Sequence, residues 1–212
     1  MTRRVYDNTR RAEQARLTRR RVLDAARDLL VERGPAAATM RDVAAHASVS
    51  VETVYKLFRT KAALIKDVYD VTLAGDDEPI PMIDRPEIQA VLAATGPRDK
   101  LARYAFAARL IGERVGPLLA RLLAGARGGD PELSQFRETI NQERMAGAGG
   151  VVRHLADTGG LRAGVDPGRA TDIVWTLISP EVYELLVSDR GWSPDEYERW
   201  LAQALTDALA AS

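Results

Sequence analysis

Residues 50–53, Ser-Val-Glu-Thr, place four different side chains at the predicted start of a short helix. Ser50 can cap that helix, which leaves the next three residues in its exposed first turn. Thr53 carries a hydroxyl and a methyl group, and Val51 can contact a thymine methyl group. Glu52 can accept a hydrogen bond from a cytosine amine or repel the phosphates of a wrong sequence. The chemistry that this set allows is recognition of base edges.

Three polar side chains that follow have the reach to contact a phosphate backbone. They are Tyr55, Lys56 and Lys61. Phosphate contacts fix a protein on a duplex, whereas base contacts carry the sequence information. A half-buried core position is the alternative for Tyr55. The segment therefore holds candidates for both kinds of contact.

Short helices with a tight turn between them would position these side chains. Gly34 and Pro35 end a first helix, in the order that is usual at a helix C-terminus. Thr39 can cap a second helix, with Asp42 in an acidic variant of the capping box. Ser48 lies at the sharp turn, where glycine would serve better because it accepts a positive φ. The predicted helices are 9–33, 40–47, 51–58 and 60–75.

The second and third of these helices fit the helix-turn-helix arrangement. Ala44 is small, so the two helices can approach closely, and the apolar Val49 and Val54 can fill the angle between them. In this arrangement the helix after the turn enters the major groove and presents its first turn to the bases. Double-stranded DNA is therefore the predicted partner.

The distribution of charge favours the same partner. Residues 1–75 hold 15 of the 30 basic and 9 of the 30 acidic residues, and the remainder holds 15 and 21. Arginines at 3–4 and 10–11 contribute to this basic end, and a basic segment on an acidic body suggests a polyanion partner for that end only. A solubilising arm is the alternative, and the arginines at 19–21 could equally form a solvated helix face.

Residues 17–70 resemble the N-terminal domain of the TetR family of bacterial transcriptional repressors. The strings that carry the resemblance are TRRRVLDAARDLLVERG and TMRDVAAHASVSVETVYKLFRTKAALI. They contain a first helix that ends in glycine, a threonine-capped second helix, a Val-Ser turn and a Tyr, Phe and Lys pattern. Two positions depart from the family, because Ser48 replaces its usual glycine and Leu57 replaces its usual histidine or tyrosine.

The resemblance assigns roles to individual residues. It implies phosphate contacts by Thr39 and Arg41 at the start of the second helix. It also implies that residues 51–53 face the major groove, while the tyrosine and lysines that follow hold the backbone. The DNA-binding residues that we expect are Thr39, Arg41, Ser50, Val51, Glu52, Thr53, Tyr55, Lys56 and Lys61.

An acidic segment with three prolines, residues 76–86, divides the chain. We expect a DNA-binding helix-turn-helix domain over 1–75, with its basic arm and connecting helix, and a larger helical ligand-binding and dimerisation domain over 76–212. The predicted fold class is all-α, because no stretch alternates with period two for long enough to form a strand. Further helices are predicted at 87–95, 98–115, 117–127, 131–158, 167–189 and 194–210.

Helix 167–189 is apolar around its whole circumference, so it must be buried on more than one side. A partner subunit can cover one side, and Pro180 should kink the helix or interrupt its hydrogen bonds. The resemblance implies a homodimer formed by the last two long helices, with recognition helices about 34–36 Å apart. The glycine-rich residues 145–150 predict close helix packing or a local break.

The resemblance also implies a small-molecule site in the second domain. Apolar walls with a few polar groups form such sites, although an aromatic or methionine side chain on a helix is more often part of a core. Arg109 lies in an otherwise apolar stretch and is the best candidate to contact an anionic group. A snorkelling surface arginine is the alternative. The ligand-binding residues that we expect are Tyr104, Arg109, Met145, Trp175 and Tyr183.

Composition limits the other functions. The chain has no cysteine, which excludes disulfides and cysteine nucleophiles and fits a cytoplasmic location. His46 and His154 lie in different predicted domains, and we expect no catalytic motif, metal or cofactor. No stretch approaches the roughly 20 apolar residues of a membrane span, and the N-terminal residues do not form a signal peptide.

We therefore expect a DNA-binding regulator, most simply a repressor that a small molecule of unknown identity releases from a palindromic operator. The ligand would favour a spacing of the DNA-binding domains that no longer fits adjacent grooves. One alternative is a DNA-binding regulator with no small-molecule effector. The other is an enzyme with an unrecognised helical active site.

Overall fold

The structure is a computed structural model that describes the backbone of residues 2–211 and the side chains of residues 10–211. Within this range the chain forms helices and no β-strand, so the predicted all-α fold is confirmed. The chain groups into two compact units. The first holds the residues up to Asp77 together with Arg121–Phe136, and the second holds Glu78–Ala120 and the residues from Arg137 onward.

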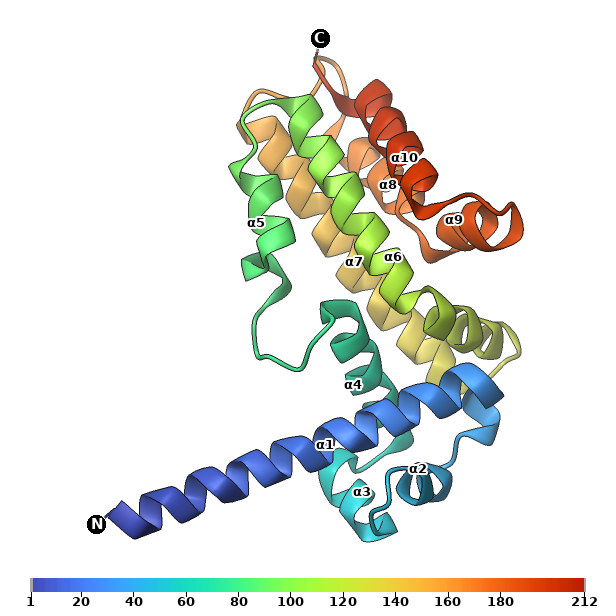
Figure 1. Ribbon diagram of the computed structural model, residues 1–212. Helices are drawn as coiled ribbons and strands as arrows, with labels where there is room; N and C mark the ends of the chain where they lie inside the picture. The colour runs from blue at the N-terminus through green and yellow to red at the C-terminus, as the bar shows by residue number, and fades with distance from the viewer. Residues whose placement is uncertain (1, 212) are drawn as a thin grey trace. The chain divides into compact units, whose positions relative to one another are not determined.

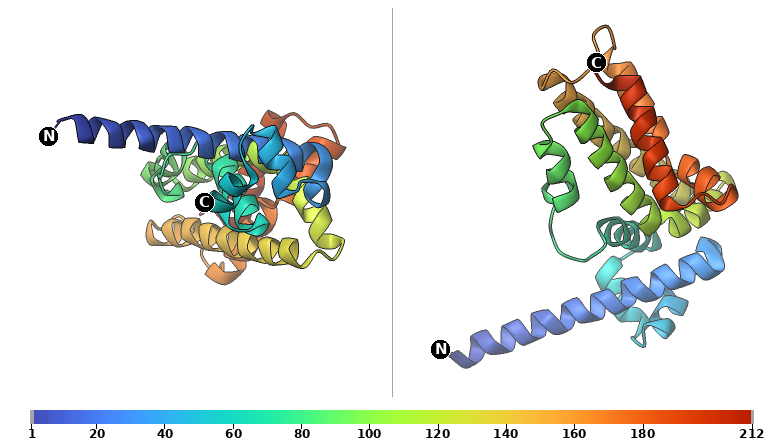
Figure 2. Two further views of the ribbon diagram at one scale, coloured as in Figure 1. Left: turned by 90° about the horizontal axis from the view of Figure 1, so that it is seen from below. Right: turned by 45° about the horizontal axis from the view of Figure 1, so that its top comes forward.

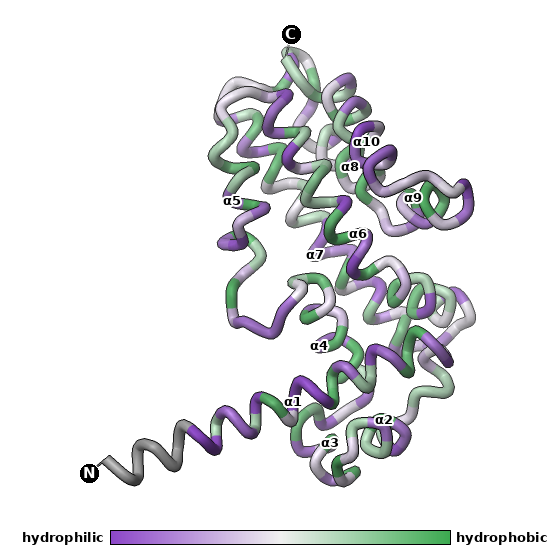
Figure 3. Tube along the Cα trace, in the orientation of Figure 1, coloured by the Kyte–Doolittle hydropathy of each residue, from purple (hydrophilic) through white to green (hydrophobic). Residues whose placement is uncertain are grey.

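The first unit is built on α1 (Thr2–Ala37), α2 (Met40–His46), α3 (Val51–Phe58) and α4 (Lys61–Ala74) (Figure 1). Regular helix geometry in α1 stops at Gly34, whose φ of 78° is in the left-handed region, as predicted. The described part of α1 alternates between polar and apolar residues (Figure 3). Its buried side chains recur every three or four residues. They are Val22, Leu23, Ala26, Leu29 and Leu30.

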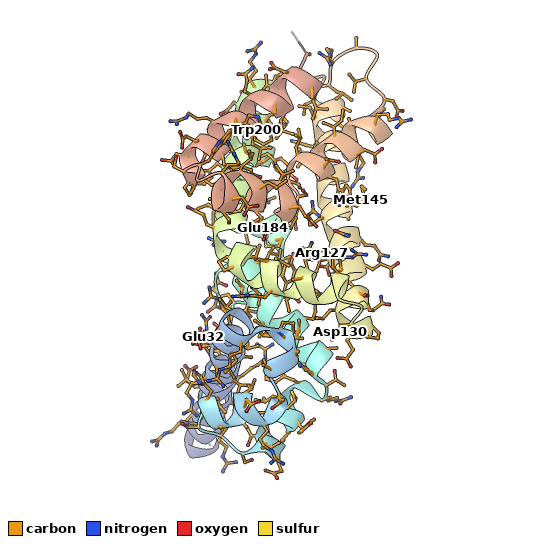
Figure 4. The ribbon with its side chains drawn as sticks, turned by 90° about the vertical axis from the view of Figure 1, so that its right-hand side faces the viewer. Glu32, Arg127, Asp130, Met145, Glu184 and Trp200 are labelled. Atoms are coloured by element: carbon orange, nitrogen blue, oxygen red, sulfur yellow. The ribbon has the colours of Figure 1, made fainter. Side chains whose placement is uncertain are left out.

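The hairpin between α6 (Pro97–Arg127) and α7 (Pro131–Asp157) also belongs to the first unit. Arg127 and Asp130 flank its turn (Figure 4). A Cβ placed on Gly125 would lie 3.2 Å from Pro35, and the rings of Tyr69 and Phe136 meet edge to face at 5.4 Å. The predicted second domain, 76–212, includes this hairpin, whereas in the structure Arg121–Phe136 groups with the first unit. A functional boundary near residue 75 stays a prediction.

The second unit contains parts of α6 and α7, which run side by side (Figures 1 and 2), together with α5 (Pro86–Ala93), α8 (Pro167–Leu177) and α10 (Pro194–Leu209). Its hydrophobic core is formed by side chains that are almost fully buried. They include Val91, Leu101, Ala105, Val152, Leu155, Val174, Leu201 and Leu205. The predicted boundary between helices 98–115 and 117–127 is wrong. α6 continues through Pro117 because Val115, Leu118 and Leu119 are buried on both sides of the proline.

The predicted helix 167–189 is interrupted, as expected from Pro180. α8 ends at Leu177, and Ser179 caps the short α9 (Pro180–Tyr183) by accepting a hydrogen bond from the Val182 amide. A single turn of π-helix over Glu184–Asp189 follows. One predicted helix is therefore three elements, because the proline at 180 has no amide hydrogen for the preceding helix.

Glycines allow two close approaches in the second unit. Gly149 in α7 lies against Arg153 and Thr171, so the glycine-rich segment packs closely and does not break the helix. In α6, a Cβ placed on Gly112 would lie 2.6 Å from Tyr183 Cδ2. The Tyr183 ring can therefore pack against α6 because residue 112 has no side chain.

A matched pair of glycine substitutions tests this packing. Gly112→Ala should lower the free energy of unfolding by about 1–3 kcal/mol, because the new methyl group collides with the Tyr183 ring. Gly147→Ala has nothing within 4 Å of its new Cβ and should raise that free energy by up to about 1 kcal/mol. Urea denaturation of the two variants measures both effects. Stabilisation by Gly112→Ala would contradict the assignment.

Candidate nucleic-acid interface

The start of α2 is fixed by a capping box, as the sequence predicted. The Asp42 amide donates to Thr39 Oγ1 at 3.2 Å, and the Thr39 amide donates to Asp42 Oδ2 at 3.2 Å. The hydrogen bonds from the Thr39 side chain and backbone lower the pKa of Asp42 below its ordinary value. The carboxylate therefore stays charged at neutral pH, where it complements the positive end of the helix. Arg41, next to this cap, is exposed.

Ser48 turns the chain between α2 and α3. Its φ is 54°, in the left-handed region that favours glycine, and its side chain is exposed. The amide of Val49 donates to the Ala44 carbonyl at 3.0 Å, which closes the turn. The turn therefore has the geometry that the sequence predicted, with serine at a position better suited to glycine.

One side of α3 is buried and the other is exposed. Val54 and Phe58 are 0% and 3% exposed and hold the helix to the core. The first turn of α3 is accessible, because Glu52 is exposed and Val51 and Thr53 are half-buried. α3 thus presents to solvent the turn that the sequence assigned to base recognition.

Ser50 caps α3, and it also engages the side chains of that first turn. Its Oγ accepts a hydrogen bond from the Thr53 amide at 3.2 Å and lies 3.1 Å from Thr53 Oγ1. Hydrogen bonds from its own amide and from the Ser50 side chain lower the pKa of Glu52. The exposed first turn is therefore locally ordered and carries one negative charge at neutral pH.

The predicted phosphate-binding residues differ in their surroundings. Tyr55 is 50% exposed, so the alternative of a core tyrosine is wrong, and Lys56 is exposed beside it. Lys61 is half-buried, and its Nζ donates to the carbonyl of Pro35. Arg59 was not predicted. It is exposed directly after α3 with a φ of 58°, and its position between two basic predictions is the signal that could have found it.

Several arginines of α1 are engaged within the first unit. Arg16 Nη1 lies 3.1 Å from Asp77 Oδ1, and Arg19 Nη2 lies 2.8 Å from Asp67 Oδ2 of α4. Arg10 and Arg11 are exposed, and the side chains of Arg3 and Arg4 lie outside the described residues. Some arginines of α1 therefore form ion pairs within the first unit, whereas others are exposed to solvent.

The second unit places the predicted ligand-binding residues in two environments. Arg109 forms ion pairs with Glu113 and Glu198, each at 2.6 Å. These two carboxylates neutralise its charge, so we do not retain Arg109 as an anion-binding group. Tyr104 and Tyr183 are buried, and burial raises the pKa of both.

Trp175 and Met145 lie on neighbouring helices of the second unit, and Met145 is half-buried on α7 (Figure 4). Arg144, which was not predicted, donates from Nη2 to the Trp175 carbonyl at 2.7 Å. The Nε1 of Trp175 is buried and has no hydrogen-bond partner among the described residues. An indole donor without a partner is a feature that sequence patterns do not reveal.

Lys100 is a second buried polar group of this unit. The side chain is 1% exposed, and in the described part of the chain its Nζ has no hydrogen-bond partner. Burial lowers its pKa below the ordinary value of 10.5. The position therefore favours an apolar side chain over a charged one.

Over residues 10–211, no group of three or more His, Cys, Asp or Glu side chains is placed to hold a metal ion. None of the described helices combines the length and the apolar character that a membrane crossing requires.

The chain is similar in sequence to known regulators. The family described as bacterial regulatory proteins of the tetR family matches residues 22–68. The uncharacterized HTH-type transcriptional regulator YdeS of Bacillus subtilis is 29% identical over 81% of this chain and 79% of the relative. An HTH-type transcriptional repressor of Mycobacterium tuberculosis is 47% identical over 23% of this chain and 26% of the relative.

Solved structures share the fold over nearly the whole chain. A complex of SmeT with triclosan aligns with a TM-score of 0.70 and 20% identity, and covers 92% of each chain. NalD of Pseudomonas aeruginosa aligns with a TM-score of 0.66 and 19% identity, and covers 93% of this chain and 98% of its own. At this identity the likeness establishes the fold.

A capped helix, a tight turn and a second capped helix with an exposed first turn define a helix-turn-helix protein that binds DNA. Together with the match over residues 22–68, they make this protein a transcriptional regulator. Residues 22–68 are similar to the tetR family of bacterial regulatory proteins, and this match includes both helices of the helix-turn-helix.

The strain at Ser48 leads to a stability prediction. Ser48→Gly should raise the free energy of unfolding by about 1 kcal/mol, because glycine adopts a positive φ without the steric cost of a Cβ. Ala45→Gly, at an exposed position within α2, should lower it by about the same amount. Thermal unfolding of both variants measures the difference. Equal destabilisation by the two changes would show that the turn is not strained.

Lys100 leads to a prediction that depends on pH. Lys100→Met should raise the free energy of unfolding by about 1 kcal/mol at neutral pH, because it removes a buried ammonium that has no hydrogen-bond partner among residues 10–211. The folded-state pKa is lowered, so the unfolded chain binds more protons between that pKa and 10.5, and wild-type stability rises with pH there. The advantage of the variant should therefore shrink as the pH approaches 10.5. Denaturant unfolding of both proteins at several pH values checks this, and a constant advantage would contradict it.

Proposed function

We propose that the protein is a repressor that binds a two-fold symmetric operator as a homodimer and leaves it when a small molecule binds the second unit. The observation that carries the proposal is the exposed, capped first turn of α3, held by the buried Val54 and Phe58. A helix that is anchored on one side and ordered at its N-terminus can enter a major groove without rearrangement.

Individual side chains then take separate roles. Val51, Glu52 and Thr53 contact base edges, and Ser50 orders them through the cap. The carboxylate of Glu52 accepts from cytosine and disfavours a close phosphate. Because Thr53 Oγ1 lies close to Ser50 Oγ, its methyl group is the part that is available to a thymine.

Residues around the first turn of α3 make the phosphate contacts. We assign them to Thr39, Arg41, Tyr55 and Lys56, and we add the exposed Arg59. In the free protein, Lys61 Nζ donates a hydrogen bond to the Pro35 carbonyl. Lys61 can therefore contact a phosphate only if this hydrogen bond breaks. The DNA-binding domain that we propose spans 1–75, and the ligand-binding and dimerisation domain spans 76–212.

Two observations support a dimer and an effector. Ile173 on α8 and Leu185 on the π-helical turn are 37% and 57% exposed, and a second subunit can cover such side chains. The structural relative SmeT forms a complex with triclosan, and NalD is described as the secondary repressor of an efflux pump. A small molecule bound in the second unit is the corresponding effector here.

Selection of bound DNA from a random pool tests the operator. The wild-type protein should select a palindrome. Thr53→Ala should change the preferred base at one position of each half-site, with a loss of about 1–3 kcal/mol on the original operator. Lys56→Ala should weaken binding to all sequences alike and reduce the salt dependence by about one unit.

Arg98→Ala is the matched control, because Arg98 is an exposed arginine on α6 and not part of the proposed interface. It should leave both the selected sequence and the affinity unchanged. If Thr53→Ala and Lys56→Ala selected the wild-type half-site with wild-type affinity, α3 would not be the reading helix.

A further inference from the structure

The side chains of Ser50, Glu52 and Thr53 form a chain of hydrogen bonds at the start of α3. Hydrogen bonds from the Glu52 amide and from the Ser50 side chain lower the pKa of Glu52. An ionised carboxylate only accepts hydrogen bonds, so Ser50 donates its single hydroxyl hydrogen to Glu52. Ser50 Oγ lies 3.1 Å from Thr53 Oγ1, and because Ser50 has no second hydrogen, Thr53 is the donor in this pair. Ser50 Oγ also accepts from the Thr53 amide at 3.2 Å.

The side chains of this turn therefore have no hydrogen left to donate to a base. Within residues 50–53, both hydroxyl hydrogens are donated inside the turn, and Val51 carries only methyl groups. Glu52 is exposed and ionised, and Val51 and Thr53 are half-buried on either side of it in the chain. What the turn offers to DNA is one negatively charged acceptor between methyl-bearing side chains.

These groups match the major-groove edge of pyrimidines. Cytosine presents an amine that a carboxylate can accept from, and thymine presents a C5 methyl group that apolar side chains can contact. Guanine presents two acceptors, N7 and O6, which would face the carboxylate of Glu52 with no hydrogen between them. Adenine combines an amine with the acceptor N7, so it suits the carboxylate less well than cytosine does.

We propose that the first turn of α3 selects cytosine opposite Glu52 beside a pyrimidine with a C5 methyl group, so that operator affinity depends on pyrimidine methylation. Thymine supplies this methyl group in ordinary DNA. 5-Methylcytosine supplies the same group together with the amine that Glu52 accepts from, so C5 methylation of the operator cytosine strengthens binding. The inference rests on the proposed function in taking α3 as the reading helix.

Glu52→Gln identifies the position of the cytosine. The amide of glutamine has both a donor and an acceptor, which pair with N7 and the amine of adenine. Selection from a random DNA pool should therefore change from cytosine to adenine at one position of each half-site. At that position the wild type should disfavour guanine by about tenfold or more. Glu32→Gln, at an exposed glutamate of α1, is the matched control and should select the wild-type sequence.

Two substitutions at Thr53 separate its methyl group from its hydroxyl group. Thr53→Val keeps a methyl group and loses the hydroxyl, and Thr53→Ser does the reverse. Because the hydroxyl is donated to Ser50, Thr53→Val should select the same half-site as the wild type. Thr53→Ser should lose the discrimination between thymine and deoxyuridine at the base that Thr53 contacts. The opposite pattern would show that the hydroxyl reads the base.

Modified operators test the methyl groups with the unmodified protein, whether or not a variant folds. Deoxyuridine in place of each half-site thymine in turn removes only a C5 methyl group. At one thymine or more it should weaken binding by about fourfold, as expected for one buried methyl group. 5-Methylcytosine at the position that Glu52→Gln identifies should strengthen binding by about twofold or more. Fluorescence anisotropy measures each dissociation constant, and the same changes in flanking DNA are the control.

The outcomes separate this inference from the proposed function. It is overturned if the wild type selects guanine at the position that Glu52→Gln changes, if deoxyuridine has no effect at any half-site thymine, or if 5-methylcytosine weakens binding. In these cases the altered selection by Glu52→Gln still shows that α3 reads the operator, so the proposed function is preserved. If neither Glu52→Gln nor Thr53→Ser changes the selected sequence or the affinity, α3 is not the reading helix and both proposals fail.

Discussion

The burial of Val54 and Phe58 fixes the orientation of α3, and each proposed base contact depends on that orientation. A helix of eight residues is too short to be stable by itself, so its geometry must come from packing and from its caps. Ser50 orders the N-terminus, and the two buried side chains keep the opposite face in the core. The first turn is consequently presented to solvent without a conformational change. The capping box of α2 and the turn at Ser48 serve this same end, because they set the angle at which α3 leaves α2.

Electrostatic pairing divides the charged residues between structure and recognition. Arg16 and Arg19 in α1 pair with Asp77 and Asp67, so part of the basic N-terminal segment holds the first unit together. Exposed residues such as Arg41 and Lys56 remain for a polyanion. In the second unit, Arg109 joins α6 to α10 through Glu198, and Arg144 joins α7 to α8 through the Trp175 carbonyl. A count of positive charges would treat these arginines as equivalent.

Local patterns predicted the first unit well. Gly34, Thr39 and Ser50 are boundary residues whose effect depends on the next few residues, and all three end or cap helices as expected. The second unit was harder, because Pro117 and Pro180 have the same local chemistry and different outcomes. α6 continues through Pro117, where Val115 before the proline and Leu118 and Leu119 after it are buried, whereas the chain breaks before Pro180. The roles of the named DNA-binding and ligand-binding residues stay predictions.

The sequence by itself determined the helical class, the helix-turn-helix motif and the resemblance of residues 17–70 to the TetR family, because caps, turns and apolar periodicity act over short distances. Tertiary structure decided which polar side chains form ion pairs or hydrogen bonds within the protein. Arg109 and Glu198 are 89 residues apart in the chain, and Arg144 and Trp175 are 31 apart. No local pattern encodes such pairs, since they depend on how whole helices pack. The same packing pairs Arg109, the predicted anion-binding residue, with two carboxylates, and it buries Trp175 Nε1 where no described residue accepts its hydrogen bond.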